Sequence, residues 1–544
     1  MTVGTSDFPV TWDDPADANH SWGFDKMHNP NAVAPLLGDL QRLVEGGLAH
    51  GFATYKIPAR LASKYTNGYI FMALKPEPGT PEELEAKGQA SQGAFMEAIG
   101  RLGELWETKW EPELRDTVTD LEKVEPGELD DAALLAHWVH TVERVERLWH
   151  VHFECLLPSY LAISELDELY GQAFPDADPQ HSFRLIQGID NLTVASGRGL
   201  WELAQRAKDS PEVLAALRSD DPMLTLASDA SGREFVKHLR AYLDEFGHRG
   251  DLWSIEHPSW IEDPAPVFHA VLDYVQRDGE DPRARVKRLA DERAALIADA
   301  RSKLEGSEIA GAFEFLLSAS ETGVVISENH GYWVDFRGMH YLRRVALAVG
   351  DRLVSAGVLP ERDDVMMLSA DEITQTLAEA PELDRSPLVA NRKADLERFR
   401  TLTPPPFIGA APQEGPENPV ARAMGKFFGG PATQSGADDV VSGLGVSPGV
   451  VRGTARLIES IDEADRLAPG EILVCATTSP PWTPLFGIAS AVVTDTGGPI
   501  SHTAVVAREY AIPAVVGTDI ATTKVSDGQT IEVDGSTGTV RIIR

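Results

Sequence analysis

The residues best suited to chemistry lie near the C-terminus, where a histidine follows a pair of glycines. An apolar run at 490–494 predicts a buried strand. Gly497 and Gly498 predict a turn after it, and a helix is expected to begin near Ser501 and His502. Glycines let a backbone approach a ligand closely, and the first turn of a helix offers N–H groups to an anion. Because the helix dipole disfavours a protonated ring there, the pattern predicts a neutral imidazole that can accept a phosphoryl group.

The same segment resembles the phosphohistidine domain of the phosphoenolpyruvate-utilising (PEP-utilising) enzymes. The family pattern is matched at ten positions: Thr494, Gly497, Gly498, Ser501, His502, Ala504, Ala507, Arg508, Ile512 and Pro513. The stretch 443–455 is similar to the start of that swivelling domain. The resemblance implies that His502 is the phosphorylated residue. It also implies a wider catalytic set of Thr494, Ser501, Thr503 and Arg508, with Gly497 and Gly498 binding the phosphate of the cofactor.

A second resemblance, to the substrate domain of rifampin phosphotransferase, covers about residues 235–375. It suggests that His248, Arg249 and Glu256 bind the acceptor. Arginine suits an incoming phosphoryl charge, and histidine or glutamate can take a hydroxyl proton. Ordinary ion pairing at a helix end explains Arg249 equally well. The stretch 328–330 and Arg337 allow the same two interpretations.

Aromatic residues and histidines gather in the first 30 residues without helical spacing. Flat apolar walls with a few polar tips commonly hold small aromatic ligands. This interpretation makes substrate-binding residues of Trp12, His20, Trp22 and His28. The alternative is that the segment caps a helical core.

Two further patterns favour structural interpretations. The predicted helix at 130–154 carries four histidines, of which His137 and His140 share a face, but no carboxylate or cysteine completes a ligand set. We therefore expect no metal bound by this chain. The basic run at 283–293 is typical of a solvated helix face, and docking of a partner subunit is its alternative use.

A Pro- and Gly-rich stretch at 402–440 predicts a linker between two domains, with a short helix inside it at 418–428. Residues 1–401 have helical spacing, clearest at 130–154, 282–304 and 338–355, and predict a mainly α-helical acceptor-binding domain. Residues 441–544 hold short Val- and Ile-rich runs. They predict a C-terminal α/β swivelling phosphohistidine domain.

The composition excludes several classes of protein. The 544 residues carry 49 Lys and Arg against 84 Asp and Glu, a formal net charge of −35, which argues against binding to nucleic acid or to an anionic membrane. No apolar stretch is long enough to span a bilayer, and the N-terminus does not resemble a secretory signal. With only two cysteines, a cytoplasmic protein is expected.

The sequence lacks the Gly-rich, basic nucleotide-binding domain with which these enzymes usually begin, and only 42 residues follow His502. This division resembles the two-component synthases that phosphorylate phenol or a methylphenol. The resemblance implies that a separate ATP-grasp subunit binds ATP and Mg²⁺, that the β-phosphate passes to His502 with release of AMP and phosphate, and that a small phenolic substrate receives it. The alternatives are a rifampin-type antibiotic phosphotransferase component and a non-catalytic phosphocarrier or regulatory protein.

Overall fold

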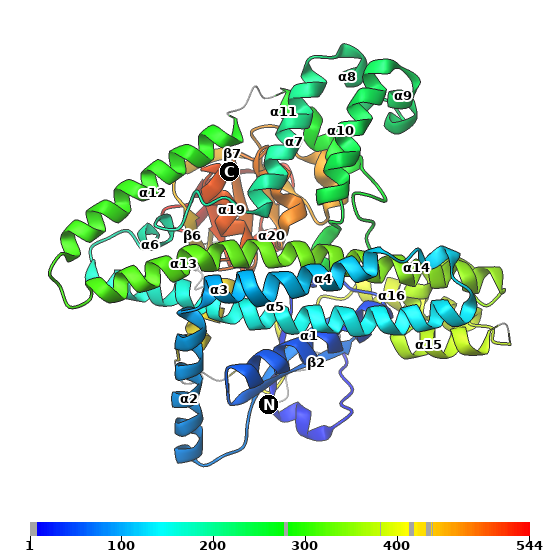
Figure 1. Ribbon diagram of the computed structural model, residues 1–544, viewed down its shortest axis with the longest axis horizontal. Coiled ribbons are helices and arrows are strands. Elements are labelled where there is room, and N and C mark those ends of the chain that lie inside the picture. Colours follow the sequence, from blue (N-terminus) through cyan, green and yellow to red (C-terminus); the bar gives the residue numbers. More distant parts are fainter. Residues whose placement is uncertain are drawn as a thin grey trace. The chain divides into compact units, whose positions relative to one another are not determined.

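The computed structural model describes residues 8–276, 281–380, 382–412, 418–430, 437 and 439–543. The chain forms two compact units, each assembled from three separate stretches. Unit 1 comprises Met1–Pro158, Trp253–His257 and His330–Glu417. Unit 2 comprises Ser159–Leu252, Pro258–Asn329 and Asn418–Arg544. Helices dominate the first 400 residues, and a sheet forms near the C-terminus (Figure 1). This confirms the predicted fold class.

Two helices of unit 1 begin at a capping box. Thr80 and Ser369 each form a capping box, and the helix after Thr80 has proline at its first position. The helices are α1 (Pro35–Thr54), α2 (Pro81–Ile99), α3 (Leu102–Leu105), α4 (Glu111–Glu122), α14 (Met339–Ser355), α15 (Ala370–Glu379) and α16 (Ser386–Arg400), with the first part of α5 (Asp131–Ala173). Two segments, Trp106–Trp110 and Tyr332–Gly338, are π-helical. The predicted helix at 338–355 is confirmed.

Unit 1 also contains an antiparallel sheet that the sequence interpretation missed. Its strands are β1 (Ser21–Phe24), β2 (Ala59–Thr66), β3 (Tyr69–Pro76) and β4 (Phe407–Gly409), in the order β2-β3-β1-β4. A two-residue turn joins β2 to β3, and both Asn67 and Gly68 have positive φ, as a tight hairpin turn requires. Strand β1 lies inside the aromatic N-terminal segment, so this segment is part of a sheet.

Proline and a side-chain cap also start many helices of unit 2. Ser210, Asp221, Asp281 and Asn418 each accept a hydrogen bond from the first turn of a helix that has proline near its start. The helices are α6 (His181–Arg184), α7 (Leu192–Lys208), α8 (Pro211–Leu217), α9 (Pro222–Ser228), α10 (Ala230–Phe246), α11 (Ala265–Gln276), α12 (Pro282–Leu304), α13 (Ala310–Gly331) and α17 (Pro419–Phe428). Helix α12 has the predicted bounds. Among the helices of the described ranges, none is long and apolar enough to cross a membrane.

The C-terminal residues of unit 2 form an eight-stranded sheet in the order β5-β12-β11-β7-β8-β9-β10-β6. Four neighbouring strands are parallel: β7 (Val450–Leu457), β8 (Ile472–Cys475), β9 (Ala491–Thr494) and β10 (Ala514–Val516). The others pair antiparallel: β5 (Val440–Ser442), β6 (Leu444–Ser447), β11 (Thr530–Asp534) and β12 (Thr539–Ile542). Helix α19 (His502–Tyr510) connects β9 to β10, while α18 (Thr483–Phe486) precedes β9 and α20 (Ala521–Lys524) follows β10.

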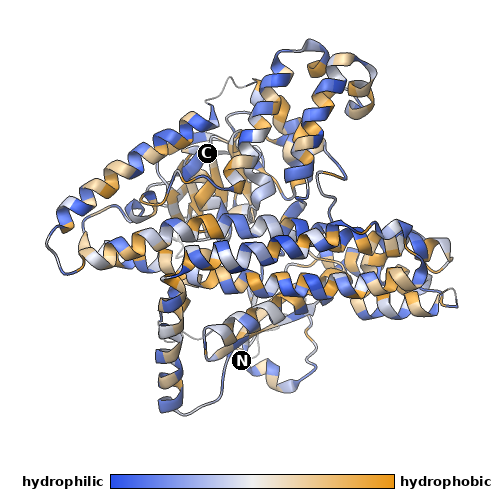
Figure 2. Ribbon diagram, in the orientation of Figure 1, coloured by the Kyte–Doolittle hydropathy of each residue, from blue (hydrophilic) through white to orange (hydrophobic). Residues whose placement is uncertain are grey.

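Alternate residues of the central strands fill two cores, one on each face of this sheet. Leu473 and Val492 face a cluster that includes Ala504 of α19, whereas Ile472 and Val493 belong to the cluster on the opposite face. The strands are strongly apolar in Figure 2 because both faces are covered. The sheet is therefore a rigid platform for the loop that precedes α19.

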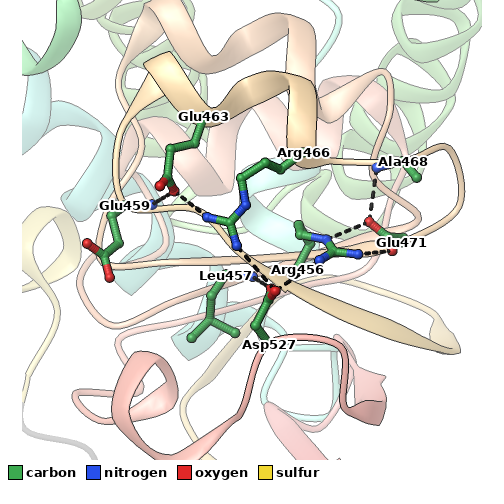
Figure 3. A network of polar contacts seen from close by, with 8 residues as sticks. All are labelled: Arg456, Leu457, Glu459, Glu463, Arg466, Ala468, Glu471 and Asp527. Atoms are coloured by element: carbon green, nitrogen blue, oxygen red, sulfur yellow. Dashed lines mark hydrogen bonds and ion pairs between the residues drawn. The ribbon is translucent and has the colours of Figure 1, made fainter.

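A network of ion pairs ties the loop between β7 and β8 to the sheet (Figure 3). Arg456 binds Glu471 through two nitrogens, at 3.0 and 2.7 Å, and Asp527 through a third, at 2.9 Å. Asp527 also accepts from the backbone N–H of Leu457 at 2.9 Å and from Arg466 at 3.2 Å. These contacts hold the loop in one place.

The predicted linker at 402–440 is partly folded. Strand β4 pairs with β1 in unit 1, and α17 belongs to unit 2, so the stretch is divided between the two units. The short helix predicted at 418–428 is confirmed. The compact units do not begin or end at residues 401 and 440. The predicted division into an acceptor-binding domain, a linker and a phosphohistidine domain at those residues therefore stays a prediction.

Candidate active site

His502 is the first residue of α19 and follows the carboxyl end of a parallel strand. The loop after β9 ends at Ser501, whose side-chain oxygen caps the helix by accepting from the N–H of Ala504 at 3.4 Å. Ligands of α/β sheets commonly bind at this edge, outside the carboxyl ends of the strands. The helix start predicted from the glycine pair is therefore confirmed.

The ring of His502 is held neutral. Both ring nitrogens are buried and make no hydrogen bond to any residue in the described ranges. Burial, together with the nearby charge of Arg249, lowers the pKa of His502 to about 3. Phe486 meets the ring edge-on at 6.3 Å between centroids. An imidazole in this state keeps its lone pair and can act as a nucleophile at neutral pH.

Arg249 is the cation beside His502. Its guanidinium is buried, donates to the hydroxyl of Ser196, and lies 5.3 Å from the ring of Phe246 and 5.9 Å from that of Trp260. Tyr242 is 3.0 Å from the Ser196 hydroxyl. This fixed guanidinium is suited to a phosphoryl group on His502, because it supplies positive charge without having to reorganise.

Arg508, which the resemblance assigned to the catalytic set, is directed elsewhere. It lies six residues after His502, so the two side chains leave α19 on different faces. Its guanidinium donates to the carbonyl of Val446 at 3.3 Å and packs on the ring of Phe183, and burial lowers the pKa of Arg508 to about 10. The contacts indicate that Arg508 fixes α19 against β6.

The two predicted threonines are also engaged in the local structure. The buried Thr494 hydroxyl donates to the carbonyl of Thr496 at 2.8 Å. The Thr503 hydroxyl is 2.8 Å from that of Thr478. These contacts shape the turn and the first residues of α19. A direct catalytic role of either hydroxyl stays a prediction.

The two glycines approach α17, where the sequence interpretation expected a phosphate of the cofactor. Gly497 and Gly498 donate their N–H groups to the carbonyls of Phe428 and Phe427, at 3.2 and 2.9 Å. A Cβ atom at position 498 would lie 2.2 Å from the carbonyl oxygen of Lys426. Phosphate binding by these glycines thus stays a prediction. It would require α17 to move away, because α17 now accepts the hydrogen bonds of both N–H groups.

Helix α17 is anchored to the α5 part of unit 2. Lys426 binds Asp167 and, at 2.9 Å, Glu168. Phe427 stacks on Tyr160 with 4.8 Å between ring centroids. The helix thus joins the loop before His502 to a helical part of the same unit.

A cleft with a cavity volume of about 40 Å³ runs along α19 between α7, α12 and α13. Its lining includes the apolar residues Val194, Pro282, Val286, Val505 and Val506, and the polar residues Thr193, Arg285, Glu328, Glu509 and Tyr510. The carboxylate of Glu328 accepts from Thr193 at 2.7 Å, and burial raises the pKa of both Glu328 and Glu509. In the sequence, Glu328 is visible only as part of the stretch 328–330. The sequence interpretation did not foresee the cleft, because its walls come from segments far apart in the sequence.

The other predicted substrate residues are divided between the units. His248, like Arg249, is buried in unit 2, whereas Trp12, His20, Trp22, His28 and Glu256 belong to unit 1. Their roles in acceptor binding stay predictions. Glu256 accepts from the N–H of Ala34 at 2.8 Å, and burial raises the pKa of its carboxyl group.

The contacts of the N-terminal aromatic residues favour the capping interpretation. Trp22 is 2% exposed, and its indole N–H donates to the carbonyl of Asp17 at 2.9 Å. The ammonium of Lys75 lies 4.6 Å from the Trp22 ring, and that of Lys64 lies 5.2 Å from the Trp12 ring. The lysines and the sheet therefore occupy positions that a flat ligand would need.

Two family models match parts of the chain. The model of the PEP-utilising enzyme mobile domain matches residues 467–538, which include β8, β9, α19 and His502. The C-terminal sheet of unit 2 is thus similar to the mobile domain of the PEP-utilising enzymes. The model of the rifampicin phosphotransferase fourth domain matches residues 152–328. That match precedes the mobile domain in the sequence and contains Arg249 and most of the cleft wall.

Known relatives agree with these two matches. The chain is 33% identical to chondramide synthase of Chondromyces crocatus over 99% of its own length and 14% of that protein. It is 27% identical to an uncharacterized phosphotransferase of Bacillus subtilis, over 72% of this chain and 47% of the relative. It is 34% identical to rifampicin phosphotransferase of a Streptomyces species, over 66% of this chain and 41% of the relative. The chain thus spans less than half the length of each of these relatives.

Proposed function

We propose that this chain is a phosphotransferase component in which His502 carries a phosphoryl group from ATP to the hydroxyl of an aromatic acceptor. The observation that carries the proposal is the neutral His502 ring at the start of α19, with both ring nitrogens buried beside Arg249, in a stretch that matches the mobile domain of the PEP-utilising enzymes. ATP and Mg²⁺ would be bound by a separate nucleotide-binding subunit of the ATP-grasp type.

The chemistry consists of three displacements at phosphorus. In the first, a ring nitrogen of His502 attacks the β-phosphorus of ATP, AMP leaves, and the ring carries a pyrophosphoryl group. In the second, water attacks the γ-phosphorus, inorganic phosphate leaves, and phosphohistidine remains. In the third, the acceptor oxygen attacks the phosphohistidine, the P–N bond breaks, and the imidazole returns to its neutral form. The hydroxyl proton passes to a base, and a buried carboxylate such as Glu328 is suited to accept it because burial raises its pKa. Arg249 stabilises the charge on the transferred group.

A small phenol is the acceptor that we propose first. The cleft along α19 has apolar walls, a carboxylate and a tyrosine, which is the composition expected of a site for a small aromatic hydroxyl compound. His502 is not among its lining residues, so transfer into the cleft requires α19 to shift against α7 and α13. Such a shift is consistent with a domain that swivels.

A rifamycin is the second candidate acceptor. The match of residues 152–328 to the fourth domain of rifampicin phosphotransferase covers the helices that line most of the cleft, and it favours this acceptor. The two candidate acceptors differ greatly in size. In both, the attacking group would be a hydroxyl oxygen, which belongs to an aromatic ring in the phenol and to a polyketide in the rifamycin.

The test separates the carrier from its donor. Phosphoramidate, a small reagent that phosphorylates histidine, would be used to charge the purified chain, and ³¹P NMR would detect phosphohistidine. Phenol, the methylphenols, rifampicin and ethanol would then be added separately. We expect loss of the phosphohistidine signal and formation of a phosphate ester with a phenol, and neither event in His502→Ala. Transfer to ethanol alone, or an equal signal in His502→Ala, would refute the proposal, while transfer to rifampicin alone would replace the phenol by the second acceptor.

A further inference from the structure

Two histidines and an aspartate from distant parts of the sequence meet inside unit 1. His152 lies on α5, His330 near the end of α13, and Asp335 on the π-helix Tyr332–Gly338. One nitrogen or oxygen atom from each lies within 4.8 Å of the other two, and Nδ1 of His152 is 3.7 Å from Oδ1 of Asp335. Both histidines are buried, at 8% and 4% exposure.

The π-helical turn is what brings the aspartate to the histidines. His330 and Asp335 are five residues apart, a spacing that an α-helix places on different faces and that the i→i+5 pattern of a π-helix brings together. Gly331 leaves room for the carboxylate, since a Cβ atom there would lie 2.8 Å from Oδ2 of Asp335. Single π-helical turns frequently occur at functional sites.

Two of the converging atoms lack the contacts that buried polar atoms normally have. Nδ1 of His152 and Oδ1 of Asp335 are buried and form no hydrogen bond with any residue of the described chain. Leaving such buried polar atoms unsatisfied destabilises the folded chain. A ligand that binds both atoms would remove this destabilisation.

The surroundings hold the aspartate in position. The side chain of Trp253 hydrogen-bonds to Asp335, and burial raises the pKa of this carboxyl group to about 7. Trp253 has a φ of 57°, an unusual value for a bulky residue, and its ring lies 5.2 Å from that of His28. His28 is paired with Asp25 at 2.8 Å. A hydrogen bond that orients a ligand residue from outside is typical of metal sites.

We propose that His152, His330 and Asp335 bind one divalent transition-metal ion in unit 1. Two imidazoles and one carboxylate are a donor set for Zn²⁺ or Fe²⁺ and a poor one for Mg²⁺. Zinc–ligand bonds of about 2.0–2.1 Å place tetrahedral ligand atoms about 3.3 Å apart. The 3.7 Å between Nδ1 of His152 and Oδ1 of Asp335 is already close to this separation. Small side-chain rotations would bring the three ligand atoms to the distances that a zinc ion requires. Three protein ligands leave one position open for water or a hydroxyl.

The experiment uses the full chain without a histidine tag, dialysed against EDTA. Competition with a chromophoric chelator would measure Zn²⁺ affinity, and Co²⁺ would report ligand geometry by its visible absorption. We expect one Zn²⁺ per chain, visible Co²⁺ bands, and no competition by millimolar Mg²⁺. Asp335→Asn and His152→Asn should each weaken Zn²⁺ binding more than 100-fold. The matched control is His140→Asn, a change on the same helix at a half-exposed histidine, and it should leave the affinity unchanged.

A variant that fails to fold would be recognised by circular dichroism, and Trp253→Phe then serves in its place. This change removes only the hydrogen bond to Asp335 and should weaken binding about 10–100-fold. The proposal is overturned if the wild-type chain binds no stoichiometric Zn²⁺. It is also overturned if the folded ligand variants, or Trp253→Phe, bind as tightly as the wild type.

Discussion

The state of a single imidazole decides whether this chain can carry a phosphoryl group. The depressed pKa of His502 leaves its ring neutral over the whole physiological range, so protonation does not compete with attack on phosphorus. A surface histidine with an ordinary pKa near 6.5 would lose nucleophilicity in mildly acid solution. Burial of the ring at the start of α19 therefore has a direct chemical consequence.

We predict that His502 does not titrate between pH 5 and pH 8. The imidazole resonances of His502, assigned in ¹⁵N-histidine-labelled protein by comparison with His502→Gln, should remain those of the neutral ring. Because the folded pKa lies below the unfolded value, the unfolded chain takes up the proton first. The stability from this group is complete above about pH 6.5 and falls as pH decreases toward 3, by at most about 1.4 kcal/mol per pH unit. A transition near pH 6.5 in the folded protein would contradict this prediction.

The two arginines of the site should separate activity from stability. Arg249→Met should slow transfer from phosphohistidine to the acceptor by about 100–1,000-fold, because the fixed charge beside His502 is lost. Arg249→Lys should restore part of the rate. Arg508→Lys is the control, since Arg508 contacts Val446 and Phe183, and it should lower the unfolding temperature while the rate per folded molecule stays the same. Single-turnover measurements on the charged chain would compare the three variants.

At the scale of elements, the C-terminal sheet was predictable and the sheet of unit 1 was not. Strands β8 to β12 are apolar runs between turn residues, and the local pattern alone predicts them. Strand β1 has only four residues and lies in an aromatic segment, and its partners β3 and β4 are far away in sequence. Short strands that depend on distant partners leave little local pattern. The local sequence therefore does not distinguish a strand from a ligand wall in this aromatic segment.

We predict that Asp527 stabilises the loop between β7 and β8 (Figure 3). The N–H of Leu457 and the nearby arginines lower the pKa of Asp527, so its contribution is complete above about pH 4 and is lost as pH falls below that value. Asp527→Asn should lower the free energy of unfolding by about 1 kcal/mol at pH 7, a modest effect because solvent screens the partly exposed carboxylate. Glu459→Gln, the same charge change at an exposed neighbour, should have no effect. In thermal unfolding, the difference in stability between Asp527→Asn and the wild type should be smaller at pH 3 than at pH 7.

We also predict that a methyl group at position 498 detaches α17 from the loop before His502. Gly498→Ala places its Cβ atom against the carbonyl of Lys426, a backbone atom that cannot rotate away. Amide hydrogens at 425–428 should then exchange faster with deuterium. Gly430→Ala, where a Cβ atom meets nothing within 4 Å, should leave the exchange rates unchanged. Equal exchange in the two variants would show that the glycine is not required for the contact.

For the whole molecule, the sequence predicts the nucleophile but not its surroundings. His502 and the turn before it form one continuous motif, so they could be recognised without a fold. Arg249 lies 253 positions earlier, and Asp335 completes a ligand set with His152 from 183 positions later. Only tertiary structure brings such residues together, so the local sequence around the histidines of α5 shows no complete ligand set.

We predict that these 544 residues do not bind ATP by themselves. The basic, Gly-rich segment that would cradle nucleotide phosphates was not found in the sequence. Calorimetry with Mg·ATP should therefore give no saturable heat with the purified chain and a stoichiometric signal once an ATP-grasp subunit is present. Micromolar binding of ATP by the chain alone would contradict the proposed division of labour.

In the mechanism that we propose, the anchoring of α17 limits how far the phosphorylated domain can move. Eleven residues separate Phe428, at the end of α17, from Val440, where the sheet begins. At about 3.3–3.6 Å per residue, a stretch of this many residues can span at most about 40 Å. While Lys426 remains bound to Asp167 and Glu168, the domain could carry the phosphoryl group of His502 only within about that distance of Phe428. A donor subunit would have to bring its nucleotide within that distance or break the contacts of α17 with α5.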